Sequence, residues 1–145
     1  MKKNFLEIES KEDLIKPFQD GEKNYSDFKI GTEHEKFAFH LNTLKPVSFF
    51  EENGIENLLK ALKKYGWDSI LEGENTIGLS RNNSLGGGTV TLEPAGQLEL
   101  SGAPLSNVHQ TYLELEEHKN QINKDGLELG IGFLGAGLTP DWSFD

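Results

Sequence analysis

Cysteine is absent from the 145 residues of this chain. Without a thiol, the chain cannot form a disulfide, bind a metal through thiolate or use a cysteine nucleophile. Arginine is almost as scarce, because Arg81 is the single arginine among the 14 basic residues. Proteins usually bind nucleotides and carboxylate substrates with arginine forks, so an enzyme of that kind would need anion-binding groups from outside this chain.

Long apolar runs are also missing, and no stretch approaches the length of a membrane span. No membrane partner is therefore expected. Met1 and the two lysines after it resemble the start of a signal peptide, but Glu7, Glu9 and Lys11 interrupt the apolar segment that should follow. The expected location is therefore cytoplasmic.

Acidic residues are abundant: 24 Asp and Glu against 14 Lys and Arg give a formal net charge of -10. This balance argues against nucleic-acid binding, which needs a basic surface, and suits a protein that binds cations. The composition, 35% hydrophobic and 26% charged, is that of an ordinary globular protein. The length suffices for one domain with a hydrophobic core.

The apolar patterning predicts strands joined by hairpins, with helices between them. Helices are expected over 10–18, 55–65 and 105–129, the last with an apolar stripe of Val108, Tyr112, Leu115 and Ile122 and a structural His109. Strands are expected over 30–39, within 43–50, as a hairpin over 67–80, as a pair over 89–101, and over 130–137, with a flexible loop over 81–88. This mixed order favours an α+β fold with an antiparallel sheet and flanking helices.

Residues 89–104 form two short alternating runs joined by a tight Pro-Ala-Gly link. Because side chains in a strand alternate between faces, each run has an apolar side for a core and a polar side. Glu93 lies on the polar side of the first run, and Glu99 lies on that of the second, beside Gln97 and Ser101. The pattern predicts two carboxylates on one half-buried sheet.

Residues 30–39 repeat this arrangement with Glu33 and Glu35 on one face. Two acids at i and i+2 of a strand lie roughly 6–7 Å apart, which would allow them to bind one cation or two neighbouring ones. The competing interpretation is a solvated acidic strand with His34 and Lys36 at the surface. Like charges on adjacent positions disfavour each other without a cation, which supports the metal site somewhat.

Two motifs resemble those of the plant-type glutamate–cysteine ligases, a family that many bacteria share. Residues 31–37 are GTEHEKF, and residues 92–104 are LEPAGQLELSGAP, where the family has LEPGGQFELSGAP. Ala95 thus stands in place of a glycine, and Leu98 in place of an aromatic residue. The helix at 105–129 and the Gly-rich segment at 130–135 also match in order.

The resemblance implies a glutamine synthetase-like catalytic domain, of which residues 1–145 would be the N-terminal part. It implies ATP- and magnesium-dependent joining of the glutamate γ-carboxylate to cysteine through a γ-glutamyl phosphate, the first step of glutathione synthesis. Glu33, Glu35, Glu93 and Glu99 would be the catalytic magnesium-binding acids, with Gln97 and Ser101 near the nucleotide or glutamate. Two alternatives stay open: a related carboxylate–amine ligase, or a non-catalytic metal- or nucleotide-binding fragment. Such a fragment would self-associate as a homo-oligomer through an exposed sheet edge.

Overall fold

The computed structural model describes residues 7–83 and 86–140. The N-terminal residues considered for a signal peptide, and residues 84–85 of the expected loop, lie outside this range. Within it, no helix is both long enough and apolar enough to cross a membrane.

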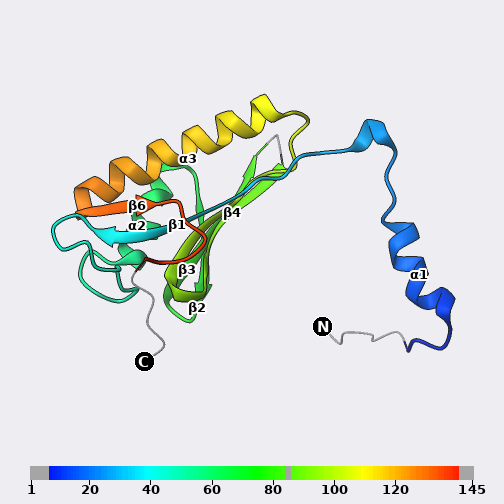
Figure 1. Cartoon of the computed structure of the whole chain (residues 1–145), viewed down its shortest axis with the longest axis horizontal. Coiled ribbons are helices and arrows are strands. Elements are labelled where there is room, and N and C mark those ends of the chain that lie inside the picture. Colours follow the sequence, from blue (N-terminus) through cyan, green and yellow to red (C-terminus); the bar gives the residue numbers. More distant parts are fainter. Residues whose placement is uncertain (1–6, 84–85, 141–145) are drawn as a thin grey trace.

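A six-stranded antiparallel sheet organises the fold (Figure 1). The strands lie in the order β2-β3-β4-β5-β1-β6. Their bounds are β1 Glu33–His40, β2 Asp68–Glu72, β3 Asn75–Asn83, β4 Gly86–Glu93, β5 Gln97–Ser101 and β6 Ile131–Leu134. The neighbouring strands β5 and β1, both inside the sheet, are far apart in the sequence, so their pairing is a long-range one. The expected α+β fold is confirmed.

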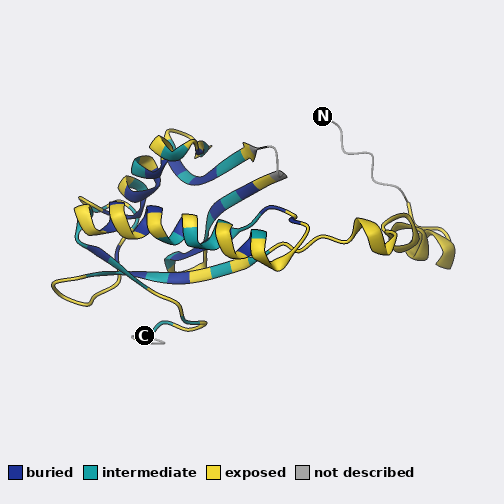
Figure 2. Ribbon diagram, turned by 90° about the horizontal axis from the view of Figure 1, so that it is seen from above, coloured by how far each residue is buried: buried dark blue, intermediate teal, exposed yellow. Residues whose placement is uncertain are grey.

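Two helices cover one face of this sheet, and a third lies apart from it (Figure 1). The helices are α1 Lys11–Asp20, α2 Ile55–Leu62 and α3 Val108–Leu129, and short 3-10 turns occupy Tyr25–Asp27, Lys63–Tyr65 and Pro94–Gly96. Helix α1 buries no residue and extends away from the sheet (Figure 2). Ser10 and Asp13 form a capping box at its start.

The core forms between α2 and the sheet, as the alternating and helical patterns predict. The helix contributes four buried residues, and strands β3, β4 and β5 contribute four more from the facing side of the sheet. These residues are Ile55, Leu58, Leu59 and Leu62, and Leu79, Val90, Leu98 and Leu100. The 3-10 turn that continues α2 ends at Gly66, whose φ of 86° a residue with a side chain would adopt only with strain.

The predicted apolar stripe of α3 is wrong at its first two positions, because Val108 and Tyr112 are 62% and 59% exposed. The buried side of this helix is mostly polar and is held by specific partners. The Trp67 indole donates to Gln121 at 3.0 Å. Asp125 accepts from the Tyr65 hydroxyl and pairs with a lysine of the 3-10 turn after α2. A polar buried face leaves no apolar periodicity in the sequence to detect.

Three local expectations also need correction. Residues 81–83 and 86–88 pair as strand, with Arg81 opposite Gly88, so the expected flexible loop is largely the end of a hairpin. Residues 43–50 form no strand but only one isolated bridge, between Phe39 and Pro46. The segment 130–137 is strand only over β6, at the sheet edge, where Ile131 alone is buried.

Arg81 joins the sheet to α3 on the helix-covered face. Its guanidinium carbon lies 4.5 Å from the centroid of the Trp67 ring, and its two terminal nitrogens lie 2.8 and 3.5 Å from the Glu117 carboxylate. Stacking and a forked pair together satisfy this side chain. The single arginine of the chain is therefore used for packing.

Replacing Ala95 by glycine is expected to raise the free energy of unfolding by about 0.5–1 kcal/mol. Ala95 has a φ of 63° in the turn between β4 and β5, a left-handed conformation that its Cβ disfavours. Urea denaturation followed by circular dichroism measures the change. The matched control is Ala61→Gly within α2, which should lower stability by about 1 kcal/mol. Equal or lower stability of the Ala95→Gly variant would show that the turn is not strained.

Candidate functional site

The sheet face opposite α2 and α3 collects every residue expected at the site. In the β1–β5 register Glu35 lies opposite Glu99, and Glu33 lies opposite Ser101. In the β4–β5 register Glu93 lies opposite Gln97. Directly paired residues of neighbouring strands point to the same side of a sheet. Strand pairing thus brings all six side chains onto one face, while their roles remain a prediction.

Glu35 and Glu99 form the centre of this acidic face. Opposite positions on antiparallel strands place Cβ atoms about 4.5–5.5 Å apart, whereas diagonal positions are about 7–8 Å apart. Glu33 and Glu93 are diagonal to Glu99, and both are exposed, as is Glu35. Glu99 is only 8% exposed, and its carboxylate accepts a short hydrogen bond from the Ser101 hydroxyl. The structure therefore distinguishes a close central pair from two outer acids.

The four acids do not converge on a single point. Among the residues that the structure describes, no group of three or more histidine, aspartate or glutamate side chains could hold a metal ion. Magnesium commonly uses only one or two protein carboxylates and takes its other oxygen ligands from water and substrate phosphates. The two facing carboxylates of Glu35 and Glu99 fit a site of this type, but not a cage of four acids.

Gln97 is already engaged by the chain itself. Its side-chain nitrogen donates to the backbone oxygen of Ala136 at 3.0 Å, and the residue is buried. This hydrogen bond ties the segment after β6 across the acidic face of the sheet. In this structure Gln97 positions that segment, and a direct contact with a ligand would use its other side-chain atom.

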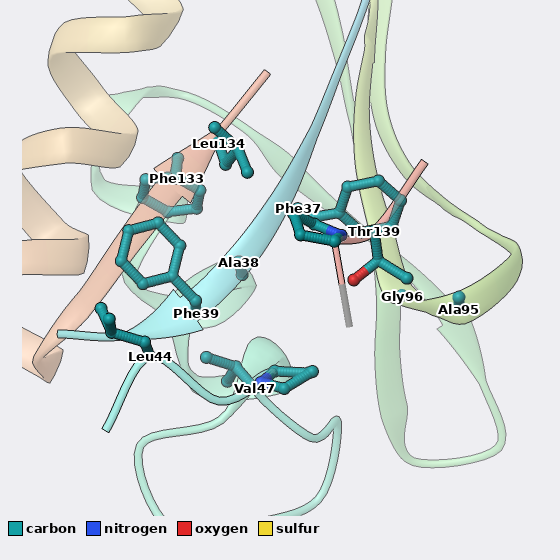
Figure 3. Close-up of a pocket in the computed structure, with 12 residues that line it drawn as sticks. Phe37, Ala38, Phe39, Leu44, Val47, Ala95, Gly96, Phe133, Leu134 and Thr139 are labelled. Carbon is teal, nitrogen blue, oxygen red and sulfur yellow. The ribbon is translucent and has the colours of Figure 1, made fainter. Parts of the chain in front are cut away.

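An apolar cavity of about 430 Å³ lies along β1 beyond the acids (Figure 3). Phe37 and Phe39 continue the face of Glu35, and the wall is completed by Leu44, Val47, Phe133 and Leu134 among others. This cavity is not evident from the sequence, because its walls come from segments that only the tertiary fold brings together. The alternation of Glu35, Phe37 and Phe39 on one face was the available signal.

Behind the acidic face, Lys36 is buried against α3. The side chain is 1% exposed, and its Nζ lies 2.9 Å from Nε2 of His118, which is 2% exposed. The interpretation of Lys36 as a surface residue is therefore wrong. Strand β1 is covered on this side by a helix whose contact residues are polar, which the local sequence does not reveal.

The chemistry of this pair follows from its burial. Burial lowers the pKa of Lys36 to about 8, and the negative charge of Glu99 acts in the opposite direction. Burial, and then the nearby Lys36 charge, lower the pKa of His118 to about 3. An ammonium group can only donate, so the neutral imidazole of His118 accepts through Nε2 and carries its proton on Nδ1.

His118 is expected to make the fold sensitive to acid. Its folded pKa of about 3 lies below the ordinary 6.5, so between these values the unfolded chain binds a proton that the folded chain does not. The free energy of unfolding should fall by up to roughly 1.4 kcal/mol per pH unit from this group as pH decreases through that window.

The measurement is urea denaturation from pH 7 to pH 4 for the wild type and His118→Gln. The variant should show a smaller loss of stability on acidification. His109→Gln, at an exposed position of the same helix, is the matched control and should follow the wild type. Identical pH slopes for all three proteins would contradict a neutral, buried His118.

Known proteins with similar sequences are glutamate–cysteine ligases. The profile of Glutamate-cysteine ligase family 2 (GCS2) matches residues 29–144. The chain is 44% identical over 134 residues to glutamate–cysteine ligase A, chloroplastic, of Oryza sativa subsp. japonica. It is 43% identical to the chloroplastic glutamate–cysteine ligase of Medicago truncatula and 42% identical to that of Arabidopsis thaliana. Each alignment covers 92% of this chain.

The same alignments cover 26%, 25% and 24% of the three relatives, so the chain spans about a quarter of their length. All three relatives are named chloroplastic, which overturns the expectation of a cytoplasmic location. The profile covers most of the chain, including every strand of the sheet and both acidic motifs. The chain belongs to glutamate–cysteine ligase family 2.

Proposed function

We propose that this chain forms one wall of the active site of a glutamate–cysteine ligase, which joins the glutamate γ-carboxylate to the amine of cysteine. The reaction would use ATP and magnesium and pass through a γ-glutamyl phosphate, at the start of glutathione synthesis. The observation that carries the proposal is the facing pair of Glu35 and Glu99 at the centre of an acidic sheet face, in a chain of this family.

The residues of this chain would have distinct roles. Glu35 and Glu99 would bind magnesium directly, and Glu33 and Glu93 would lie at the edge of the site. The bound cation would offset the charge of the phosphates and align the reacting oxygens. The Ser101 hydroxyl would orient the Glu99 carboxylate through their hydrogen bond. Because the substrate carboxylate is the nucleophile, no serine or cysteine nucleophile is needed.

The residues around Glu35 and Glu99 are those expected if this chain forms only part of the active site. The apolar cavity begins at Phe37, two residues along β1 from Glu35, and leaves room for an uncharged part of a substrate. The single arginine pairs with Glu117 on the opposite face. The cationic groups that would bind the terminal phosphate must therefore come from another part of the enzyme.

A chimera tests this function directly. The chain would replace the corresponding quarter of the rice ligase with which it is 44% identical. We expect the chimera to release ADP only when ATP, magnesium, glutamate and cysteine are all present. A folded chimera that releases no ADP, beside an active rice enzyme, would refute the proposal.

An assay of the isolated chain tests whether it is one wall of an active site or carries a complete active site by itself. With ATP, magnesium, glutamate and cysteine, the 145-residue chain alone should release no phosphate above the blank. Steady phosphate release that requires both amino acids would show that the chain carries a complete active site, and the view of a single wall would be wrong.

A further inference from the structure

Lys36 is a charged residue for which the proposed reaction has no role. It directly follows Glu35 on β1, yet its side chain points to the opposite side of the sheet, where its ammonium group contacts His118. Removing a charge from water is costly unless another charge compensates for it. A fully buried lysine beside a neutral imidazole therefore needs a carboxylate elsewhere.

Two acids of α3 on the same side of the sheet are bonded to other groups. Glu117 of α3 pairs with Arg81, and one Glu114 oxygen accepts from the backbone nitrogen of Ala103. Within the described part of the chain, Lys36 forms no ion pair with a carboxylate within 4.0 Å. The carboxylate that raises the pKa of Lys36 is that of Glu99, on the other face.

The strand register explains how this charge acts through the sheet. Lys36 is paired with Leu98, and the adjacent pair in the same two strands is Glu35 with Glu99. The surroundings of Lys36 are dry, because Leu98 and Leu100 on the same helix-covered face are fully buried. Charges in buried surroundings are screened far less than charges in water. The ammonium therefore acts on the Glu99 carboxylate from behind.

We propose that Lys36 is a positioning residue: a buried counter-charge behind Glu99 that limits the affinity of the facing pair, Glu35 and Glu99, for a free divalent cation. The inference rests on the cation site of the proposed function. A cation that arrives with nucleotide phosphates brings negative charge with it, so the counter-charge opposes the free ion more strongly than the nucleotide-bound ion. Lys36 would thereby favour loading of the site by the metal–nucleotide complex.

The test is Mn²⁺ binding to the 145-residue chain, measured from the free-ion signal in electron paramagnetic resonance. Lys36→Gln removes the charge but retains an N–H donor for His118, and its dissociation constant for Mn²⁺ should fall about tenfold. Lys36→Arg keeps the charge and should match the wild type. Lys60→Gln, at a surface position of α2 paired with Glu56, makes the same change in net charge and should have no effect.

The direction in which the Mn²⁺ affinity changes distinguishes a counter-charge from a residue that only supports the fold. If Lys36 only supported the fold, Lys36→Gln would disturb the acid pair and weaken Mn²⁺ binding. Lys36→Met, which fills the buried site with an apolar side chain, is the second neutral variant and should also bind more tightly. Equal or weaker binding by both folded variants would overturn the inference.

The same titrations distinguish failure of the inference from failure of the cation site. Wild-type binding that Glu99→Gln removes, with no gain in Lys36→Gln, would refute the counter-charge and leave the cation site intact. Absence of binding in the wild type and in both neutral variants would overturn the inference and the cation site together. Binding that appears only when Lys36 is neutralised would support the counter-charge.

Discussion

Glu99→Gln is expected to abolish Mn²⁺ binding by the isolated chain and to lower ligase turnover of the rice chimera at least about 100-fold. Glu99 is the most buried of the four acids, faces Glu35 directly and is held by the Ser101 hydroxyl. Glutamine keeps the shape of the side chain and the acceptor for that hydroxyl, but it removes the negative charge. The loss should therefore occur without unfolding.

The other acids provide graded comparisons. Glu35→Gln should match Glu99→Gln, because the two carboxylates face each other, whereas Glu33→Gln and Glu93→Gln should have smaller effects from diagonal positions. Glu116→Gln is the matched control, since this acid pairs with Lys119 on α3, away from the acidic face. Full turnover and Mn²⁺ binding in both central variants would refute the assignment of the site.

Gly54→Ala is expected to lower the free energy of unfolding by roughly 3 kcal/mol. A Cβ at Gly54 would lie 2.5 Å from the backbone oxygen of Ser48, 2.8 Å from that of Glu51 and 2.9 Å from that of Phe49. These oxygens accept hydrogen bonds from the backbone at 54–56, so they cannot move without loss. The strain falls at the start of α2, which carries four core residues.

Urea denaturation measures this effect, and Gly137→Ala is the control. A Cβ at Gly137 meets nothing within 4 Å, and its φ is not in the left-handed region, so the substitution should change stability by less than about 0.5 kcal/mol. If Gly54→Ala changed the free energy of unfolding as little as the control does, residues 48–51 would not approach the helix start this closely.

Local patterns predicted most of the fold. The alternation in 89–101 assigned each side chain of β4 and β5 to its observed face, and the helix expected over 55–65 is present as α2 and the 3-10 turn after it. The pattern failed for α3, where Val108 and Tyr112 are exposed and the buried positions are polar. Hydrophobic periodicity reports burial only where burial is apolar, so partners such as Trp67 with Gln121 leave no trace in it.

The candidate site shows the same limit. The sequence placed all four acids on the polar sides of their strands, since alternation needs only neighbouring residues. Which acids face each other depended on the register between β1 and β5, a pairing of distant segments. The apolar cavity and the contact of Lys36 with His118 likewise join parts of the chain that are remote in sequence.

The sequence by itself determined the α+β class, the polar and apolar faces of the strands and membership of the ligase family, because these follow from local alternation and contiguous motifs. The tertiary structure decided that Glu35 and Glu99 form the central pair, that the arginine is used for packing, and that a lysine is buried behind the acids. Each of these depends on strand register and helix docking, which are set by the free energy of the whole fold rather than by any local segment.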